Sequence, residues 1–195
     1  MSLITLPEGS WVVPGHSRIP APEELTLTQR FFLRLTRKAA GVSENLNVFL
    51  PLSRLGSIFP RYLLFLSHLL TKGRIPRADK ERIILRVAWR LGCVYEWGHH
   101  SHMARELGIN ESEVASIARQ DTGEWDDRLR VFIRAADELI DQRSLSQSCW
   151  DELSTQLSTD QLVEFCMLVG HYVMVAGLIN ATGVCIESGY LEGVS

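Results

Sequence analysis

The sequence predicts an all-α fold. From residue 23 onward, apolar residues recur at three- and four-residue spacing, and no stretch alternates apolar and polar residues between hairpin turns. The chain has 195 residues, of which 46% are hydrophobic and 22% charged, so we expect one globular domain. Prolines and glycines crowd the first 22 residues and block regular structure there. We therefore predict a proline-rich arm, residues 1–22, followed by a single all-α domain, residues 23–195.

The first half of the domain shows three helical segments. The segment that begins near Leu25 ends at Gly41, and a second covers residues 54–70 with Pro60 at a kink or restart. Residues 79–91 form the third, because a single apolar stripe follows an acidic first turn.

The second half adds five more segments. Residues 93–107 are ended by Gly108, a typical C-terminal cap, and Asn110 can cap the next helix by accepting from the backbone N–H of Glu113. Three further helices are expected over residues 126–142, 149–157 and 159–179. The set amounts to about seven to eight helices. The last one is apolar all round, which is typical of a helix central to a bundle or shared between subunits.

Charge and cysteine usage limit the classes of partner. A formal net charge of −3 without a basic cluster gives no electrostatic reason to bind nucleic acid, and no charge run suggests a membrane surface. The apolar stretch 165–179 is too short to cross ~30 Å of hydrocarbon, so we expect a buried helix. The four cysteines form no C-x-x-C pair, and the N-terminus lacks a signal-peptide layout, so a cytoplasmic protein with free thiols is expected.

The chemistry is concentrated in residues 91–108. On a helical wheel, Glu96 and His100 fall on the stripe that should be buried, four residues apart, where side chains meet. A buried carboxylate must be paired, protonated or placed in a pocket, and a Glu–His pair meets this requirement while forming an acid/base couple. The alternatives are a structural core pair or a rotated stripe with a solvated Glu96.

Cys93 lies one turn before both residues, just after Gly92. In the first turn of a helix, the dipole lowers the pKa of a thiol and favours the thiolate. A lone cysteine is about equally well explained as a small apolar residue that fills core space.

Neighbouring aromatic and histidine side chains are secondary candidates. His99 and His102 point away from His100 on the wheel, so one helix cannot direct all three at one ion, and we predict no metal site. Residues that could line a substrate pocket, but that are equally consistent with core packing, are Tyr95, Trp97, His99 and His171.

Glu81 and the run from Cys93 to His100 resemble the carboxymuconolactone decarboxylase family, which includes the AhpD alkylhydroperoxidases. The AhpD-type pattern is a Glu twelve residues before a C-x-x-C-x-x-x-H segment. Glu81, Cys93 and His100 match it, whereas Glu96 stands where the second, peroxide-attacking Cys should be. Flanking segments extend the resemblance over about residues 45–185.

The resemblance implies an AhpD-like helical bundle that assembles as a homodimer, trimer or hexamer. It also places the Glu in a proton relay with Cys and His. On one straight helix Glu81 and Cys93 would lie ~18 Å apart, so the relay requires a chain break, which we place at Gly92.

The site residues and the resemblance are consistent with three alternative functions. The first is a cofactor-free, lyase-like decarboxylase acting on a small organic acid or lactone, in which His100 donates a proton, Glu96 orients it, and Glu81 and Cys93 complete the site. The second is a thiol-dependent alkylhydroperoxide reductase with peroxiredoxin activity that uses Cys93 alone, because the internal disulfide cannot form. The third is a non-catalytic oligomeric protein whose Glu96–His100 pair is structural.

Overall fold

The computed structural model describes residues 4–40, 44–119 and 125–191. Within these ranges it is all-α, as predicted, and the only β pairing consists of two isolated bridges. The helices are α1 (Leu27–Ala40), α2 (Phe49–Ser53), α3 (Ile58–Thr71), α4 (Arg77–Arg90), α5 (Val94–Glu106), α6 (Glu111–Ile117), α7 (Asp127–Gln142), α8 (Gln147–Gln156) and α9 (Thr159–Thr182).

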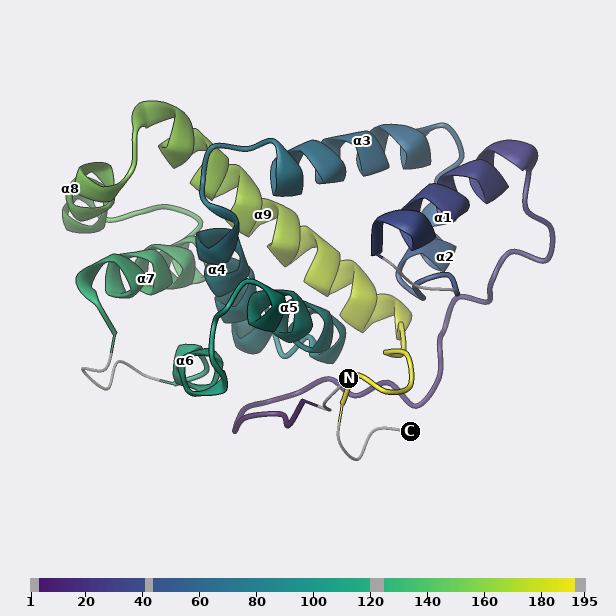
Figure 1. Ribbon diagram of the computed structural model, residues 1–195, viewed down its shortest axis with the longest axis horizontal. Helices are drawn as coiled ribbons and strands as arrows, with labels where there is room; N and C mark the ends of the chain where they lie inside the picture. The colour runs from purple at the N-terminus through teal and green to yellow at the C-terminus, as the bar shows by residue number, and fades with distance from the viewer. Residues whose placement is uncertain (1–3, 41–43, 120–124, 192–195) are drawn as a thin grey trace.

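Helix α9 runs through the middle of the molecule (Figure 1). Helices α4 and α7 pack against it, α5 packs against α4, and α8 packs against α7. Buried apolar side chains fill three adjoining regions, one among α4, α7, α8 and α9, one among α4, α5, α6 and α7, and one where α5 and α9 meet α2 and α3. Helices α4 and α5 therefore lie at the centre of the packing and hold their side chains firmly.

Helix α9 begins and ends at residues that suit its termini. The Ser158 side chain accepts from the backbone N–H of Gln161 in a capping box, and Gly183 ends the helix at φ +70°. Among the described residues, α9 is the one helix long and apolar enough to cross a membrane by length and composition alone. Half of its most apolar stretch is buried within the protein.

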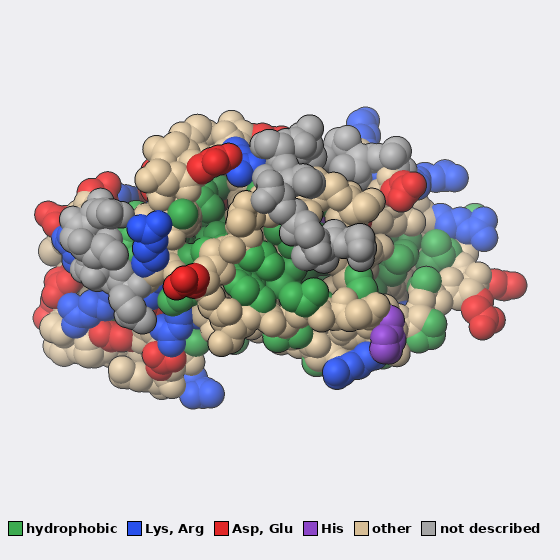
Figure 2. Space-filling model, turned by 90° about the horizontal axis from the view of Figure 1, so that it is seen from below, with side chains coloured by type: hydrophobic (Ala, Val, Ile, Leu, Met, Phe, Trp, Pro, Cys, Tyr) green, Lys and Arg blue, Asp and Glu red, His purple; other side chains and the backbone are tan. Residues whose placement is uncertain are grey.

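The N-terminal arm crosses the lower edge of the molecule in Figure 1. Its backbone donates from Ile4 to the carbonyl of Tyr190 at 3.0 Å and from Val12 to the carbonyl of Gly92 at 2.8 Å. Seen from below, hydrophobic side chains are visible along the middle of this face, while charged ones gather toward its two ends (Figure 2). The arm thus ties the C-terminal segment to the turn between α4 and α5.

The helix count is the main departure from expectation, since nine helices lie in the described residues instead of seven to eight. The extra element is α2, whose five residues include Pro51 and are too few to show a helical period. The helix predicted over residues 54–70 begins instead at Ile58, and Pro60 lies in its first turn, where a missing backbone N–H costs nothing.

Candidate active site

The turn between α4 and α5 brings the site together. The predicted break at Gly92 is confirmed: its φ is +60°, and a Cβ there would collide with the backbone carbonyl of Ser10 in the arm. Helix α5 folds back along α4, so Glu81 and His100 come into direct contact although they are 19 residues apart.

His100 lies between two carboxylates. Its Nδ1 is 2.6 Å from Glu81 Oε2, and its Nε2 is 3.1 Å from Glu96 Oε2. All three side chains are buried, with exposed side-chain fractions of 4% for Glu81, 5% for His100 and 8% for Glu96. A charged imidazolium donates to both carboxylates at once, which satisfies the groups that burial would otherwise leave unpaired.

This arrangement sets the protonation state of His100. Burial alone would lower the pKa of the imidazole, but the charge and hydrogen bond of Glu81, together with those of Glu96, raise it to about 10. His100 therefore carries its proton throughout the neutral range. The pair Glu96–His100 was expected from the sequence, whereas Glu81 was expected only by resemblance.

A small cavity of about 120 Å³ opens beside Glu96 and His100. Helices α3, α5 and α9 and the segment at α2 form its walls, and most of its lining is apolar. No Lys or Arg lines it among the described residues. A cavity of this size holds a single small ring. The His100 imidazolium at its wall already has two carboxylate partners, Glu81 and Glu96.

Two tyrosines add hydroxyl groups to the cavity wall, and sequence reasoning did not single them out as site residues. Burial and the charge of Glu96 raise the pKa values of Tyr62 and Tyr172 well above the ordinary value, so both phenols stay protonated. The Tyr172 ring also meets the His100 ring edge-on, with 5.0 Å between centroids. Nothing in their spacing distinguishes them, because they come from α3 and α9 and meet only in the folded chain.

His171 also lines the cavity, stacked on Tyr62 with 5.6 Å between ring centroids. Burial lowers the pKa of its imidazole, which keeps the ring neutral. Its Nε2 is buried without a hydrogen-bond partner in the described parts of the chain.

Tyr95 and His99 are also in the lining, but both are engaged by the C-terminal segment. The Tyr95 hydroxyl donates to Glu187 at 2.9 Å, and His99 Nε2 lies 2.7 Å from the other oxygen of the same carboxylate. Burial would raise the pKa of Glu187, but the hydrogen bond and charge of His99 lower it below its usual value. Glu187 therefore fixes two cavity residues in place.

Trp97 lies elsewhere, contrary to the prediction that it could line this pocket. It packs against Trp11 of the arm on the opposite side of α5, with ring centroids 5.5 Å apart. The wheel could not separate the two sides, because α5 is buried on nearly every face.

Cys93 does not have the environment of a reactive thiol. It is the N-cap residue of α5 with 0% exposure, it packs among apolar side chains of α1 to α3 and α9, and it does not line the cavity. Burial, with the nearby charge of Glu96, raises the pKa of the thiol far above its ordinary value, although the backbone N–H groups of Tyr95 and Glu96 oppose this. The thiolate expected from the helix dipole is therefore disfavoured.

The remaining histidine of the run, His102, contacts Tyr190 of the C-terminal segment edge-on at 5.0 Å. No group of three or more His, Cys, Asp or Glu side chains in the described ranges is placed to hold a metal ion. All four cysteines are free thiols.

Known proteins share this architecture. A solved structure described as an alkylhydroperoxidase AhpD core, an uncharacterized peroxidase-related protein from Ralstonia eutropha JMP134, matches with a TM-score of 0.78 at 17% identity, over 89% of this chain and 94% of that one. An uncharacterized peroxidase-related protein from Silicibacter sp. TM1040 matches with a TM-score of 0.79 at 13% identity, over 96% and 100%. A debrominase matches with a TM-score of 0.68 at 17% identity, over 83% and 87%.

These likenesses define the class of the protein as an AhpD-like all-α fold. Residues 58–138, which contain Glu81, Cys93, Glu96 and His100, match the model of the carboxymuconolactone decarboxylase family, so the resemblance predicted from the sequence is confirmed. No curated protein matches the chain.

Proposed function

We propose that the protein is a cofactor-free acid/base enzyme that transfers a proton to or from a carbon atom of a small, uncharged, unsaturated ring such as a lactone. The observation that carries this proposal is the buried Glu81–His100–Glu96 array beside a small apolar cavity. Glu96 and His100 reach the cavity, while Glu81 lies behind His100 and does not line it.

Glu96, His100 and Glu81 have different roles in this reaction. The Glu96 carboxylate accepts a proton from an acidic carbon of the ring, and the His100 imidazolium supplies the proton that the carbon regains. Glu96 then returns its proton to His100 Nε2 across their 3.1 Å contact, which restores both groups. Glu81 is a positioning residue, since it fixes the ring of His100 through Nδ1 and balances its charge. The hydroxyls of Tyr62 and Tyr172 can donate to a carbonyl oxygen that becomes negative when the proton leaves.

The charged groups at the cavity favour an uncharged substrate over one that carries a carboxylate. Decarboxylation, which the family name suggests, requires a substrate carboxylate. No Lys or Arg of the described chain lines the cavity to receive one, and the His100 imidazolium is already paired with Glu81 and Glu96. An uncharged ring brings no carboxylate into the cavity, so proton transfer on such a ring avoids the free-energy cost of burying an unpaired charge. A structurally similar debrominase has been solved in complex with 2,3,4-tribromopyrrole, which is also a small ring.

The proposal is tested by proton exchange. We expect the protein to catalyse deuterium uptake from D₂O into the ring of a five-membered unsaturated lactone, observed by NMR, and to act poorly on the same ring bearing a carboxylate. Replacing Glu96 with Gln should slow uptake by roughly 10²- to 10⁴-fold. The matched control is Glu106→Gln, because Glu106 is exposed on the same helix and outside the cavity.

Cys93→Ser separates this chemistry from thiol chemistry and should leave deuterium uptake nearly unchanged. Full activity of Glu96→Gln would reject the proposal. Peroxide consumption that disappears in Cys93→Ser would favour the thiol-dependent alternative instead.

We also propose that the protein forms a homo-oligomer through the outward face of α9. Val163, Met167 and Met174 are exposed on one side of this helix, and Gly170 and Gly177 on the same side have open space where a side chain would lie. A helix of a second copy can approach closely there. Replacing both Met167 and Met174 with Lys should reduce the mass measured by light scattering to that of a monomer, whereas Gln147→Lys on α8 should not. A monomeric wild-type protein would contradict this.

A further inference from the structure

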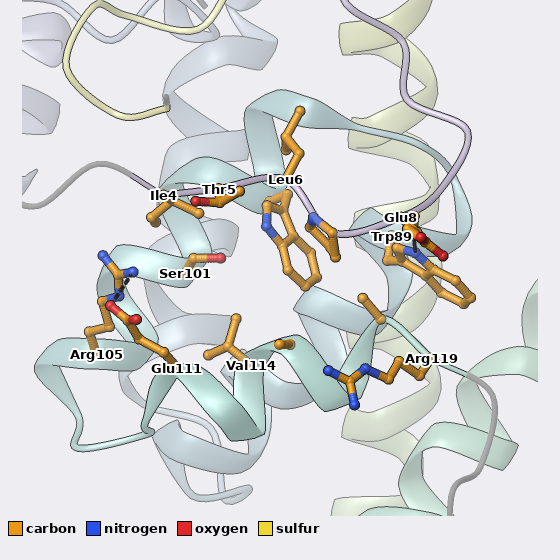
Figure 3. A pocket seen from close by; sticks show the side chains of 14 residues that line it. Ile4, Thr5, Leu6, Glu8, Trp89, Ser101, Arg105, Glu111, Val114 and Arg119 are labelled. Carbon is orange, nitrogen blue, oxygen red and sulfur yellow. Dashed lines mark hydrogen bonds and ion pairs between the residues drawn. The ribbon is translucent and has the colours of Figure 1, made fainter. Parts of the chain in front are cut away.

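A second pocket lies on the other side of α5 from the candidate active site, between α5 and α6 and beneath residues 4–8 of the arm (Figure 3). Its volume is about 740 Å³, which lies within the range of pockets that bind drug-sized ligands. The side chains that α5 contributes to it point away from the cavity of Glu96 and His100, because the two sets lie on opposite faces of the helix.

Two hydrogen-bonding side chains that line this pocket are left unmatched by the part of the chain that the structure describes. Trp97 Nε1 and Ser101 Oγ are buried, each residue being 1% exposed, and neither atom has a hydrogen-bond partner within the described residues. An indole N–H can only donate, so an acceptor atom is required to satisfy it. In Figure 3, Ser101 points toward the space between the arm and α6. An acceptor atom on a bound molecule would match both groups.

Arg105 extends the row of donors. Trp97, Ser101 and Arg105 are spaced four residues apart on one face of α5, so their side chains follow one another along the pocket. Arg105 pairs with Glu111 at 2.7 Å, but the Glu111 side chain is 74% exposed. Such a solvated pair contributes little, so a ligand carboxylate can replace Glu111 as the partner of Arg105.

The opposite wall is apolar and small. Val114 and Ala115 of α6 and Ala118 at its C-cap line this wall and leave room for a flat or chain-like hydrocarbon body. The charged groups at the pocket are Arg105, Arg119, Glu8 and Glu111. We propose that this pocket binds an organic acid with an apolar body, whose carboxylate accepts from Ser101 and Arg105 and whose second acceptor or carboxylate oxygen reaches Trp97.

The test uses 2-naphthoate as the probe, with binding measured by isothermal titration calorimetry. We expect saturable binding, weakened about 2- to 12-fold by Trp97→Phe or Ser101→Ala, each of which removes one hydrogen bond. Arg105→Gln should weaken binding at least about 10-fold, because it removes a charged partner. Arg77→Gln on α4, outside the pocket, is the matched control and should bind like the wild type.

Two comparisons make the result decisive. The uncharged amide, 2-naphthamide, should bind more weakly than the acid, and equal affinity would overturn the assignment of a carboxylate ligand. Glu96→Gln should bind the probe normally, because the fused rings are too large for the small cavity; loss of binding in this variant would place the probe there and overturn the proposal. Absence of binding at millimolar probe, or unchanged affinity in all three pocket variants, would also overturn it. None of these outcomes depends on catalysis.

Discussion

Replacing His100 with Gln is expected to lower the free energy of unfolding by about 3–5 kcal/mol, the usual loss when one partner of a buried ion pair is removed. The imidazolium is the positive group between Glu81 and Glu96, both of which are buried. Glutamine keeps a hydrogen-bond donor but removes the charge, so two carboxylates are left facing a neutral amide. Urea unfolding at pH 7 measures the loss.

The matched control is His68→Gln. His68 is exposed on α3, and its Nδ1 contacts the nearby Leu64 carbonyl and Ser67 hydroxyl, so the change should cost less than about 0.5 kcal/mol. A loss below about 1 kcal/mol in His100→Gln would show that the carboxylates are stabilised without the imidazolium.

The pH dependence gives a second measurement of the same interaction. The pKa of His100 rises from 6.5 to about 10 on folding, so the folded state binds this proton more tightly than the unfolded state. The stabilisation is fully present below pH 6.5 and is lost as the pH rises toward 10. The difference in stability between wild type and His100→Gln should therefore shrink over this window, and a difference that stays constant would contradict the raised pKa.

Local sequence signals were sufficient where one helix or one turn decides the structure. Gly92 gave the break between α4 and α5, and the Asn110 side chain accepts from the backbone N–H of Glu113 as predicted. Glu96 and His100 meet because four residues make one helical turn. In each case the partners lie within a few residues, so no knowledge of the tertiary fold was needed.

Features of the site that depend on the packing of several helices could not be predicted from the sequence. Tyr62, Tyr172 and Glu187 come from α3, α9 and the C-terminal segment, and they reach α5 only through tertiary packing. The environment of Cys93 was misjudged for the same reason: the helix dipole is a local effect, whereas the apolar packing that raises its thiol pKa comes from other helices. Trp97 was misplaced because a helix buried on nearly all sides has no single apolar stripe.

Arg86 is another residue that the sequence did not reveal, and replacing it with Met should cost about 3–5 kcal/mol of stability. Its side chain is 2% exposed and binds both oxygens of Asp137 through Nε and Nη2, at 2.9 and 2.7 Å. Nη1 donates to the carbonyl of Ile117 at 2.7 Å and to that of Arg119 at 2.6 Å. The guanidinium also lies over the ring of Trp89, 4.5 Å from its centroid. One side chain thereby joins α4 to α7 and to the C-terminal end of α6.

The double variant Arg86→Met, Asp137→Leu distinguishes a lost ion pair from lost packing. If the cost arises mainly from the unpaired Asp137, the double variant should be more stable than Arg86→Met alone, because the stranded carboxylate is gone. The Ile117 and Arg119 carbonyls lose their donor in both variants, so part of the loss should remain. Arg90 also reaches Asp137, at 2.9 Å, and limits the gain in stability.

Because Arg86 lines neither the small cavity nor the larger pocket, the folded fraction of Arg86→Met should keep the proton-exchange rate and the 2-naphthoate affinity of the wild type. A variant that folds but loses exchange would instead make Arg86 a positioning residue for Glu81 on the same helix.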